Sequence, residues 1–510
     1  MSSNRHLDEA WHYHEGTSHS YHSIRNNSHY LDWANHPLPF KIYSTLEPRR
    51  LPREFPQSGV AALSAIGENV RHNQVSSPTL DDLTAILYFS AGITKRRPYP
   101  GGEMFFRAAA CTGALYEFEL YVVCGELADL AAGVYHFGPA ETALRQLRAG
   151  DHRALLAQAT AHEDAIVHAP LTILCAGTYW RNAWKYQSRT YRHFGWDNGT
   201  LLANLLAVAA ARGLPARVVM AFLDREVNRL LDLDSEREVA FSVVPIGYLA
   251  DAQFPATPPV EPLCLATTPL SRKEVVYPAM RQMHTASSLE TESEVREWRE
   301  QRTPEEPPVP ADGIPLQPLN EENLPRDPIE RVILRRGSTR QFAEEPISFA
   351  QLSTMLARST RGFPADFHNP SAALLNQLYL IVNAVDGLQP GSYYFHRDAR
   401  RLELLKAGNF RREAAYLGLD QELPGAASAN VFFLADLKAT LDRYGNRGYR
   451  SAQLEAGILG GKLYLAAYAL GLGASGLTFY DDDVVRFFSP HAAGKSAIFL
   501  TCLGRSAWKK

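Results

Sequence analysis

A helix with apolar residues on nearly every side is the clearest hydrophobic pattern in the chain. Between positions 201 and 211, Leu and Val recur at helical spacing with alanines between them. Such a helix is expected to be buried, and Gly213 is expected to end it. The polar stretch before it, residues 178–199, carries Lys, Tyr, Arg and Trp side chains that a core does not favour. This stretch predicts either one wall of a ligand site for an anionic, aromatic molecule or an exposed face of salt bridges.

The same pattern occurs a second time, 258 residues later. Lys185-Tyr186 aligns with Arg443-Tyr444 at this offset. Further pairs at the same offset are Arg189 with Arg447, Tyr191 with Tyr449, Arg192 with Arg450, Gly199 with Gly457 and Asp224 with Asp482. An ungapped match of this length indicates that the chain contains two copies of one module.

Composition divides the chain into four segments. Residues 1–58 form a polar N-terminal arm with seven histidines that follow no known metal-ligand spacing, and we expect this arm to pack on its neighbours. Residues 59–252 form module 1, and residues 328–510 form module 2. Between them, residues 253–327 form a Pro-rich linker with a charged, helix-prone middle at 290–301, which we expect to wrap the surface.

Helices and short strands alternate irregularly within each module. In module 1, helices are predicted over 59–70, 78–91 and 145–159, and strands over 118–123, 133–137, 171–176, 216–219 and 243–246. The Pro- and Gly-rich residues 98–102 are predicted to form a loop. Several strands lie next to hairpin-like turns, which favours an α+β fold over a doubly wound parallel sheet. Each module is therefore predicted to be a mixed β-sheet flanked by helices.

Charge and cysteine content exclude several classes of protein. The net charge of −3 gives no reason to expect nucleic acid or an anionic membrane as a partner. The five cysteines are scattered and form no CxxC pair, which favours free thiols in a reducing cytoplasm over a disulfide scaffold or a metal site. We find no apolar run long enough to span a membrane and no signal peptide at the N-terminus, so we expect a cytoplasmic protein.

A compact group of anion-binding residues opens module 2. Arg335, Arg336, Ser338 and Arg340 lie within six residues, and Arg505 follows the last predicted strand as a candidate partner. Guanidinium groups bind phosphate oxygens in a bidentate manner, and a serine hydroxyl adds a donor. The group predicts a phosphate site, with a solvated basic helix start as the alternative.

Two segments that contain small residues and glycine lead to different predictions. Thr112, Gly113 and Ala114 are small enough for a flat ring to approach the backbone, although a tight loop before a strand would look the same. The segment GLGASG at 471–476 matches the dinucleotide-binding fingerprint. We interpret it as a helix stop and a turn, because it follows a helix where the fingerprint must follow a strand.

The pair Lys185-Tyr186 is the candidate for proton transfer. A lysine whose pKa falls on burial can exchange a proton when a tyrosine lies beside it. A surface lysine next to a packed tyrosine is the alternative. Module 2 carries Arg443 at the lysine position, and arginine stays protonated, so it cannot act as a base.

These segments together resemble the nitroreductase superfamily, and within it the SagB-type dehydrogenases that oxidise azolines to azoles. The resemblance is carried by RRGSTRQF at 335–342, GALYEFELYVV at 113–123, AGVYHF at 132–137 and WKYQSRTYR at 184–192 with Asp197, Gly199 and Asn204. It covers nearly all of both modules but neither the arm nor the linker. The Lys-Tyr pair followed by Arg-x-Tyr-Arg points to the SagB type, whereas the arginine motif, interrupted by Gly337, is typical of nitroreductases in general.

The resemblance implies FMN as the cofactor and flavin sites at the seam between two modules. Enzymes of this kind are usually homodimers, so the tandem modules are expected to form a pseudo-dimer within one chain, with further oligomerisation left open. By likeness to the family, the FMN phosphate would be held by Arg335, Arg336, Ser338, Arg340 and Arg505. Thr112, Gly113 and Ala114 would approach the flavin from module 1, and Lys185 and Tyr186 would be catalytic.

The chain also departs from the family pattern. Module 1 lacks the paired arginines and module 2 lacks the lysine, so we expect one good flavin site and one degraded site. The family's usual Pro-Ser before the small-residue loop is replaced by Ala110-Cys111.

The resemblance therefore predicts an FMN-dependent oxidoreductase that moves a hydride between a small-molecule or peptide substrate and flavin N5. One alternative is an NAD(P)H-dependent nitroreductase or a quinone or flavin reductase. Another is a non-catalytic, flavin-binding scaffold in a peptide-modifying complex with a cyclodehydratase-like partner.

Overall fold

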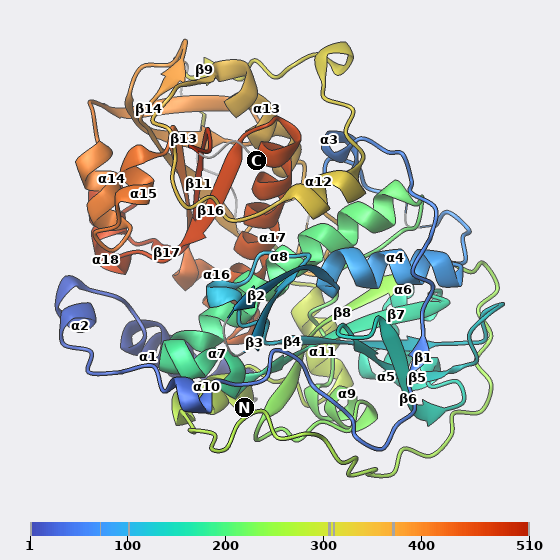
Figure 1. Ribbon diagram of the computed structural model, residues 1–510. Helices are drawn as coiled ribbons and strands as arrows, with labels where there is room; N and C mark the ends of the chain where they lie inside the picture. The colour runs from blue at the N-terminus through green and yellow to red at the C-terminus, as the bar shows by residue number, and fades with distance from the viewer. Residues whose placement is uncertain are drawn as a thin grey trace.

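The computed structural model describes residues 3–71, 73–99, 102–303, 308–309, 312–369 and 373–507. Two modules lie side by side, the first drawn in blue to green and the second in orange to red (Figure 1). Each has one large sheet with helices packed on it, which confirms the predicted α+β fold with two modules in tandem. Among the described residues, no helix combines the length and the apolar character needed to cross a membrane.

The sheet of module 1 has the strand order β1-β6-β5-β4-β7-β8. Its strands are β1 (Arg49–Arg50), β4 (Phe118–Cys124), β5 (Gly133–Gly138), β6 (Ala143–Ala149), β7 (Leu171–Thr178) and β8 (Glu238–Ile246). Every residue of β4, β5, β7 and β8 is buried, because helices and loops cover both faces. The strand predictions for 118–123, 133–137, 171–176 and 243–246 are thus confirmed.

The sheet of module 2 repeats this arrangement in the order β16-β17-β15-β11-β13-β14-β9. Its strands are β9 (Ile314–Pro315), β11 (Asn376–Val382), β13 (Gly391–His396), β14 (Arg401–Ala407), β15 (Ala429–Ala435), β16 (Gly473–Leu477) and β17 (Ser496–Gly504). Mixed sheets were expected, but every strand pair described in the two large sheets is antiparallel. The GLGASG segment ends a helix, as predicted, but only its first two residues form the turn, because residues 473–476 belong to edge strand β16.

Four local predictions in module 1 were wrong. The helix predicted over 59–70 is reduced to α3 (Ala62–Ala65). Residues 143–149 are strand β6, so the predicted helix 145–159 shortens to α5 (Arg153–Ala159). Residues 216–219 form only isolated bridges. The predicted loop at 98–102 belongs to a hairpin of β2 (Ile93–Tyr99) and β3 (Gly102–Arg107), with positions 100 and 101 outside the described residues. An exposed two-stranded ribbon tolerates the proline at 98 because its edge needs no partner strand.

The helices around the sheets follow the same repeat. Module 1 contains α3 (Ala62–Ala65), α4 (Leu80–Ala91), α6 (Asp164–Val167), α7 (Tyr179–Tyr186), α8 (Thr190–Ala211) and α9 (Asp224–Leu230). Module 2 contains α12 (Ile329–Arg335), α13 (Phe349–Ser359), α14 (Arg411–Leu417), α15 (Glu422–Ala426), α16 (Leu437–Tyr444), α17 (Arg447–Ala469) and α18 (Asp481–Phe488). Residues 201–209 of α8 are all buried, as the apolar pattern predicts.

The arm and the linker both contain ordered helices. The arm carries α1 (Asp8–Gly16) and α2 (Tyr21–Arg25), and the linker carries α10 (Pro278–Ala286) and α11 (Glu292–Arg299). Helix α11 confirms the predicted helical middle of the linker. The linker runs over the outside of module 1 before it reaches module 2 (Figure 1).

Helices α8 and α17 cross at the boundary between the modules (Figure 1). A Cβ atom on Gly199 would lie 2.5 Å from the Cα atom of Gly457, so the two backbones touch at this pair. The repeat therefore places equivalent glycines at the crossing, where any larger side chain would separate the helices.

Two buried ion clusters join the modules on either side of this crossing. Arg189 and Arg192 of module 1 contact Asp481 of module 2, with N–O distances of 3.1 and 2.5 Å. Reciprocally, Arg447 and Arg450 of module 2 contact Asp224 of module 1, at 2.6 and 2.7 Å.

The clusters correct two expectations from the sequence. Arg189 and Arg192 of the polar stretch form buried ion pairs across the seam, and Arg181 is paired with Glu119 inside module 1, whereas an exposed salt-bridged face or the wall of a ligand site had been expected. The residue that plays the part of Asp224 in module 2 is Asp481, one position before the aligned Asp482.

Candidate functional site

The anion-binding segment of module 2 starts at the C-terminal end of α12, close to the seam. Arg335, the last residue of α12, donates to Asp327 at 2.6 Å and to the carbonyl oxygen of Tyr468 at 2.8 Å. Its charge is therefore matched by the last residue of the linker, and the side chain fixes the end of the helix.

Arg336 reaches across the seam into module 1. Its Nε and Nη2 atoms donate to the carbonyl oxygen of Ala108, at 3.2 and 3.0 Å. Its guanidinium carbon lies 5.9 Å from the ring centre of Tyr464, whose hydroxyl is 3.3 Å from Ser338 Oγ. Arg336 and Ser338 thus lie together at the base of the module 1 loop that begins after Ala108.

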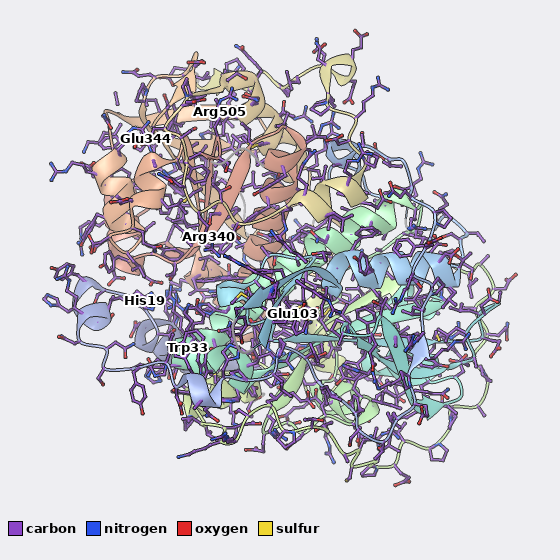
Figure 2. The ribbon with its side chains drawn as sticks, in the orientation of Figure 1. His19, Trp33, Glu103, Arg340, Glu344 and Arg505 are labelled. Atoms are coloured by element: carbon purple, nitrogen blue, oxygen red, sulfur yellow. The ribbon has the colours of Figure 1, made fainter. Side chains whose placement is uncertain are left out.

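Arg340 and Arg505 occupy different places. Both side chains are exposed, but Figure 2 shows Arg505 well away from Arg340. Arg505 donates to the carbonyl oxygen of Pro346 at 3.1 Å and lies 3.7 Å from Glu345. The structure therefore brings Arg336, Ser338 and Arg340 to the seam and leaves Arg505 outside this group.

The small-residue loop of module 1 is held from below by a carboxylate. The backbone N–H of Thr112 donates to both oxygens of Asp197, at 2.9 and 3.0 Å, and the Thr112 hydroxyl donates at 2.8 Å. Gly113 and Ala114 have φ values of 64° and 55°, in the left-handed region that costs energy for a residue with a side chain. A Cβ atom on Gly113 would lie 2.9 Å from the Tyr186 hydroxyl oxygen, so glycine lets the loop and the tyrosine touch.

Lys185 and Tyr186 lie at the end of α7, beside this loop. The Lys185 amine lies 5.2 Å from the centre of the Tyr186 ring, and both residues are half-buried. Burial lowers the pKa of Lys185, and the charge of Arg340 lowers it further. Burial, followed by the charges of Asp197 and Cys111, raises the pKa of Tyr186. At neutral pH the tyrosine therefore keeps its proton, while the lysine loses its proton more readily than a lysine in water.

The effect of Arg340 on Lys185 shows that the two modules meet beside the small-residue loop. Arg340 belongs to module 2 and Lys185 to module 1, yet the charge of one acts on the other. No ion pair between Lys185 and an acid is found in the part of the chain that the structure describes. The seam thus combines cations and hydroxyls from module 2 with an amine, a phenol and a small-residue loop from module 1.

Comparison with known proteins agrees with this arrangement. The nitroreductase family model matches residues 70–248 and 333–500, which are the two modules and more than half of the chain. The chain belongs to the nitroreductase family. It is similar over 98% of its length to a protein from Anabaena variabilis named as a nitroreductase, whose crystal structure is covered to 99% with a TM-score of 0.75 and 28% identity. It is also 28% identical over 173 residues to a protein named as a nitroreductase from Methanocaldococcus jannaschii, a match that covers 34% of this chain and 82% of that protein.

The second seam of this nitroreductase-family chain is filled by the linker. Tyr444, the counterpart of Tyr186, packs against Trp298 of α11 with ring centres 5.1 Å apart, and Trp298 Nε1 donates to the Tyr444 carbonyl oxygen at 2.8 Å. Trp298 is 1% exposed. Arg443 donates to the carbonyl oxygen of Arg302 at 3.0 Å, so the linker also occupies the position equivalent to Lys185.

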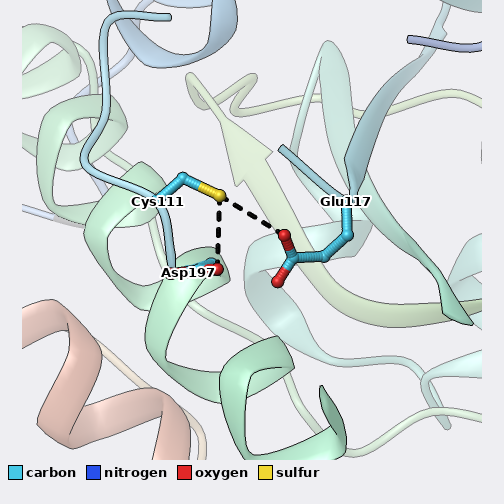
Figure 3. Close-up of side chains that lie close together, drawn as sticks. All are labelled: Cys111, Glu117 and Asp197. Carbon is cyan, nitrogen blue, oxygen red and sulfur yellow. Dashed lines mark hydrogen bonds between the residues drawn. The ribbon is translucent and has the colours of Figure 1, made fainter. Parts of the chain in front are cut away.

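Sequence reasoning missed a buried triad behind the small-residue loop, shown in Figure 3. Cys111 Sγ lies 3.3 Å from Glu117 Oε2 and 3.2 Å from Asp197 Oδ2. Three groups that can carry negative charge thus meet in one place. The replacement of the family's usual serine by Cys111 was the available signal. Asp197 was named as part of the family resemblance, but nothing in the sequence placed it beside Cys111 and Glu117, because it comes from α8, 86 residues away from Cys111.

Proposed function

We propose that this chain is an FMN-dependent oxidoreductase with one flavin site at the seam formed by Arg336, Ser338 and Arg340 on one side and Lys185 and Tyr186 on the other. The observation that carries the proposal is that Arg336 of module 2 donates to the Ala108 carbonyl oxygen at the base of the module 1 loop that contacts Tyr186. In addition, the charge of Arg340 of module 2 lowers the pKa of Lys185 of module 1. Like charges that lie close together cost free energy unless an anion lies near both, and a phosphate or an electron-rich ring edge would provide one.

The donors at this seam suit FMN. Arg336 uses Nε and Nη2 on a backbone carbonyl and has Nη1 left to bind an oxygen atom of a phosphate group, and Ser338 offers a hydroxyl donor. The space beside Gly113 is taken by the Tyr186 hydroxyl, so the loop and this phenol would approach the flavin ring together. Arg335 would keep the helix end in place, and Arg505 would act only if its side chain left Glu345. When bound, FMN would supply the acceptor for a hydride.

Lys185 and Tyr186 have distinct roles in this proposal. A substrate that loses a hydride from one carbon must lose a proton from a neighbouring atom to form a double bond. Lys185 accepts that proton because burial and Arg340 favour its neutral form. Tyr186, which holds its proton, donates a hydrogen bond that orients the substrate. The finer assignment to SagB-type oxidation of azolines is supported by the Lys-Tyr pair and the Arg-x-Tyr-Arg spacing that follows it.

A second candidate is an NAD(P)H-dependent reductase of nitro compounds or quinones. It is favoured by the similarity to a protein named as a nitroreductase over 98% of this chain. The two candidates differ in the direction of electron flow. Rapid bleaching of the bound flavin by NAD(P)H alone would favour the reductase, whereas bleaching by an azoline-containing peptide would favour the dehydrogenase.

The purified chain tests the proposal directly. We expect one FMN per chain, because Trp298 and Arg302 already occupy the equivalent space at the second seam. Lys185→Ala should lose turnover and keep its flavin, while Arg443→Ala, at the matching position of the other seam, should behave like the unaltered chain. A colourless protein that cannot be reconstituted with FMN would end the proposal, and two flavins per chain would refute the single site.

A further inference from the structure

The triad of Cys111, Glu117 and Asp197 contains more hydrogen-bond acceptors than the single hydrogen of the Cys111 thiol can satisfy. The thiol carries one hydrogen, yet Sγ lies within 3.3 Å of an oxygen of each acid, and it also accepts the backbone N–H of Tyr116 at 3.0 Å. One hydrogen can be donated to only one of the two carboxyl oxygens. The other contact would set sulfur and oxygen lone pairs against each other unless that acid carries a proton of its own.

The hydrogen-bond partners indicate which acid that is. Asp197 accepts three hydrogen bonds from Thr112, which is the usual environment of an ionised carboxylate. Glu117 is fully buried, and its Oε1 atom has no hydrogen-bond partner among the described residues. Burial and the charge of Asp197 raise the pKa of Glu117 well above its usual range, which agrees with this assignment.

We propose that Glu117 holds a proton at neutral pH, that Cys111 and Asp197 keep it in place, and that this triad stores a proton for the seam site beside Tyr186. The use of the stored proton at the seam rests on the proposed function. The presence of the proton on Glu117 does not depend on it. In the transfer step Tyr186 gives its phenolic proton to a group at the seam that takes one up, the O–H bond of Glu117 breaks, a new O–H bond forms on the Tyr186 oxygen, and Glu117 is left as a carboxylate.

The triad lies directly behind the loop that touches Tyr186. The Thr112 hydroxyl donates to Asp197, and the next residue, Gly113, is the backbone position that touches the Tyr186 hydroxyl. A cavity of about 20 Å³ borders the triad and is lined by both acids and Cys111. This volume is enough for one water molecule, which can carry a proton between buried groups.

The other titratable and charged groups around the triad come from several elements. They are Arg107 of β3, Tyr116 of the loop itself, Tyr186 of α7 and Arg336 of module 2. Arg107 already lies 3.8 Å from Glu119 on β4, and Arg336 donates to the Ala108 carbonyl oxygen. The two cations therefore have other partners, and a proton remains the way to neutralise Glu117.

Infrared spectroscopy of the full-length chain, purified and then stripped of flavin, tests the store separately from the proposed function. We expect the C=O stretching band of a protonated carboxyl group at neutral pH, shifted on exchange into D2O. The band should disappear in Glu117→Gln and remain in Cys111→Ser, which keeps both acids and a hydroxyl at the same place. Absence of the band from the unaltered chain at neutral pH would overturn the proposal, and so would one tightly bound metal ion per chain in elemental analysis.

The pH profile of the flavin-loaded chain gives the second readout. If the store serves the site, Glu117→Gln should shift the pH dependence of turnover and leave the flavin content unchanged, because the amide cannot release a proton. A profile identical to that of the unaltered chain would show that the triad only holds the loop and would overturn its role in proton supply. A chain without flavin but with the infrared band would instead count against the proposed function alone.

Discussion

Asp481→Asn should be among the most damaging single-atom changes in this chain. Asp481 is a side chain of α18 that is 3% exposed and contacts Arg192 at 2.5 Å and Arg189 at 3.1 Å. It also accepts the backbone N–H of His19 at 2.8 Å, so it ties the arm to both modules. Asparagine keeps the shape but removes the negative charge, and two guanidinium groups would remain buried without it.

The expected loss is about 3–5 kcal/mol, the usual cost of breaking a buried ion pair from one side. Asp483→Asn, two residues along the same helix, is the matched control. Its partner Arg486 is 76% exposed, and surface pairs of this kind contribute about 0.2–1 kcal/mol. Asp224→Asn, which affects the reciprocal cluster with Arg447 and Arg450, should cost about as much as Asp481→Asn.

Urea unfolding, followed by tryptophan fluorescence and far-ultraviolet circular dichroism, measures these differences. The pH dependence gives a second check. The two arginines hold the pKa of Asp481 below its usual range in the folded chain, against about 3.9 when unfolded. The stabilisation is therefore complete above about pH 4 and is lost as the pH falls further, so the gap between the unaltered chain and Asp481→Asn should narrow in acid. Equal losses from Asp481→Asn and Asp483→Asn at neutral pH would refute the assignment of the seam's stability to this cluster.

Three further predictions concern the site and the helix crossing. Lys185→Ala should lower turnover about 100- to 10,000-fold, as expected when a general base is removed, with flavin content measured by absorbance as the control. Arg336→Ala should weaken FMN binding about 10- to 100-fold in a fluorescence titration, because a charged hydrogen bond contributes about 1.5–3 kcal/mol. Arg505→Ala should have the smaller effect, and the reverse order would contradict the placement of the phosphate group. Gly199→Ala should destabilise the chain by about 1–3 kcal/mol in thermal unfolding, because its Cβ atom would meet another backbone at 2.5 Å. Gly16→Ala, where no atom lies within 4 Å of the added carbon, should not, and equal effects would show that the crossing tolerates separation.

Periodicity and the internal repeat predict much of this fold. Strands β4, β5 and β7 and helix α8 follow from local patterns of apolar residues, and the offset of 258 residues predicts their counterparts. Local patterns were less informative where tertiary contacts decide the outcome. Residues 143–149 show no regular alternation of polar and apolar side chains and lie within a stretch that also suits a helix, and pairing with β5 selects the strand.

The site was harder to predict for a related reason. Arg189 and Arg192 gave a pattern of charge, but the acid that neutralises them lies almost 300 residues away in sequence, so their role could not be predicted from the local sequence. Trp298 shows the same difficulty, since nothing near α11 in the sequence indicates which surface its apolar side chain will cover. Lys185, Tyr186, Arg336 and Ser338 were named from short motifs, and the structure brings them to one seam.

The covalent joining of the two modules has an evolutionary consequence. In an assembly of identical subunits, every mutation enters both symmetry-related sites at once, so neither can be tried out alone. In this chain, a mutation such as the one that distinguishes Lys185 from Arg443 changes only one of the two seams. Natural selection can then change one seam for chemistry, while the other seam becomes a fixed structural contact that is closed by the linker between the two modules.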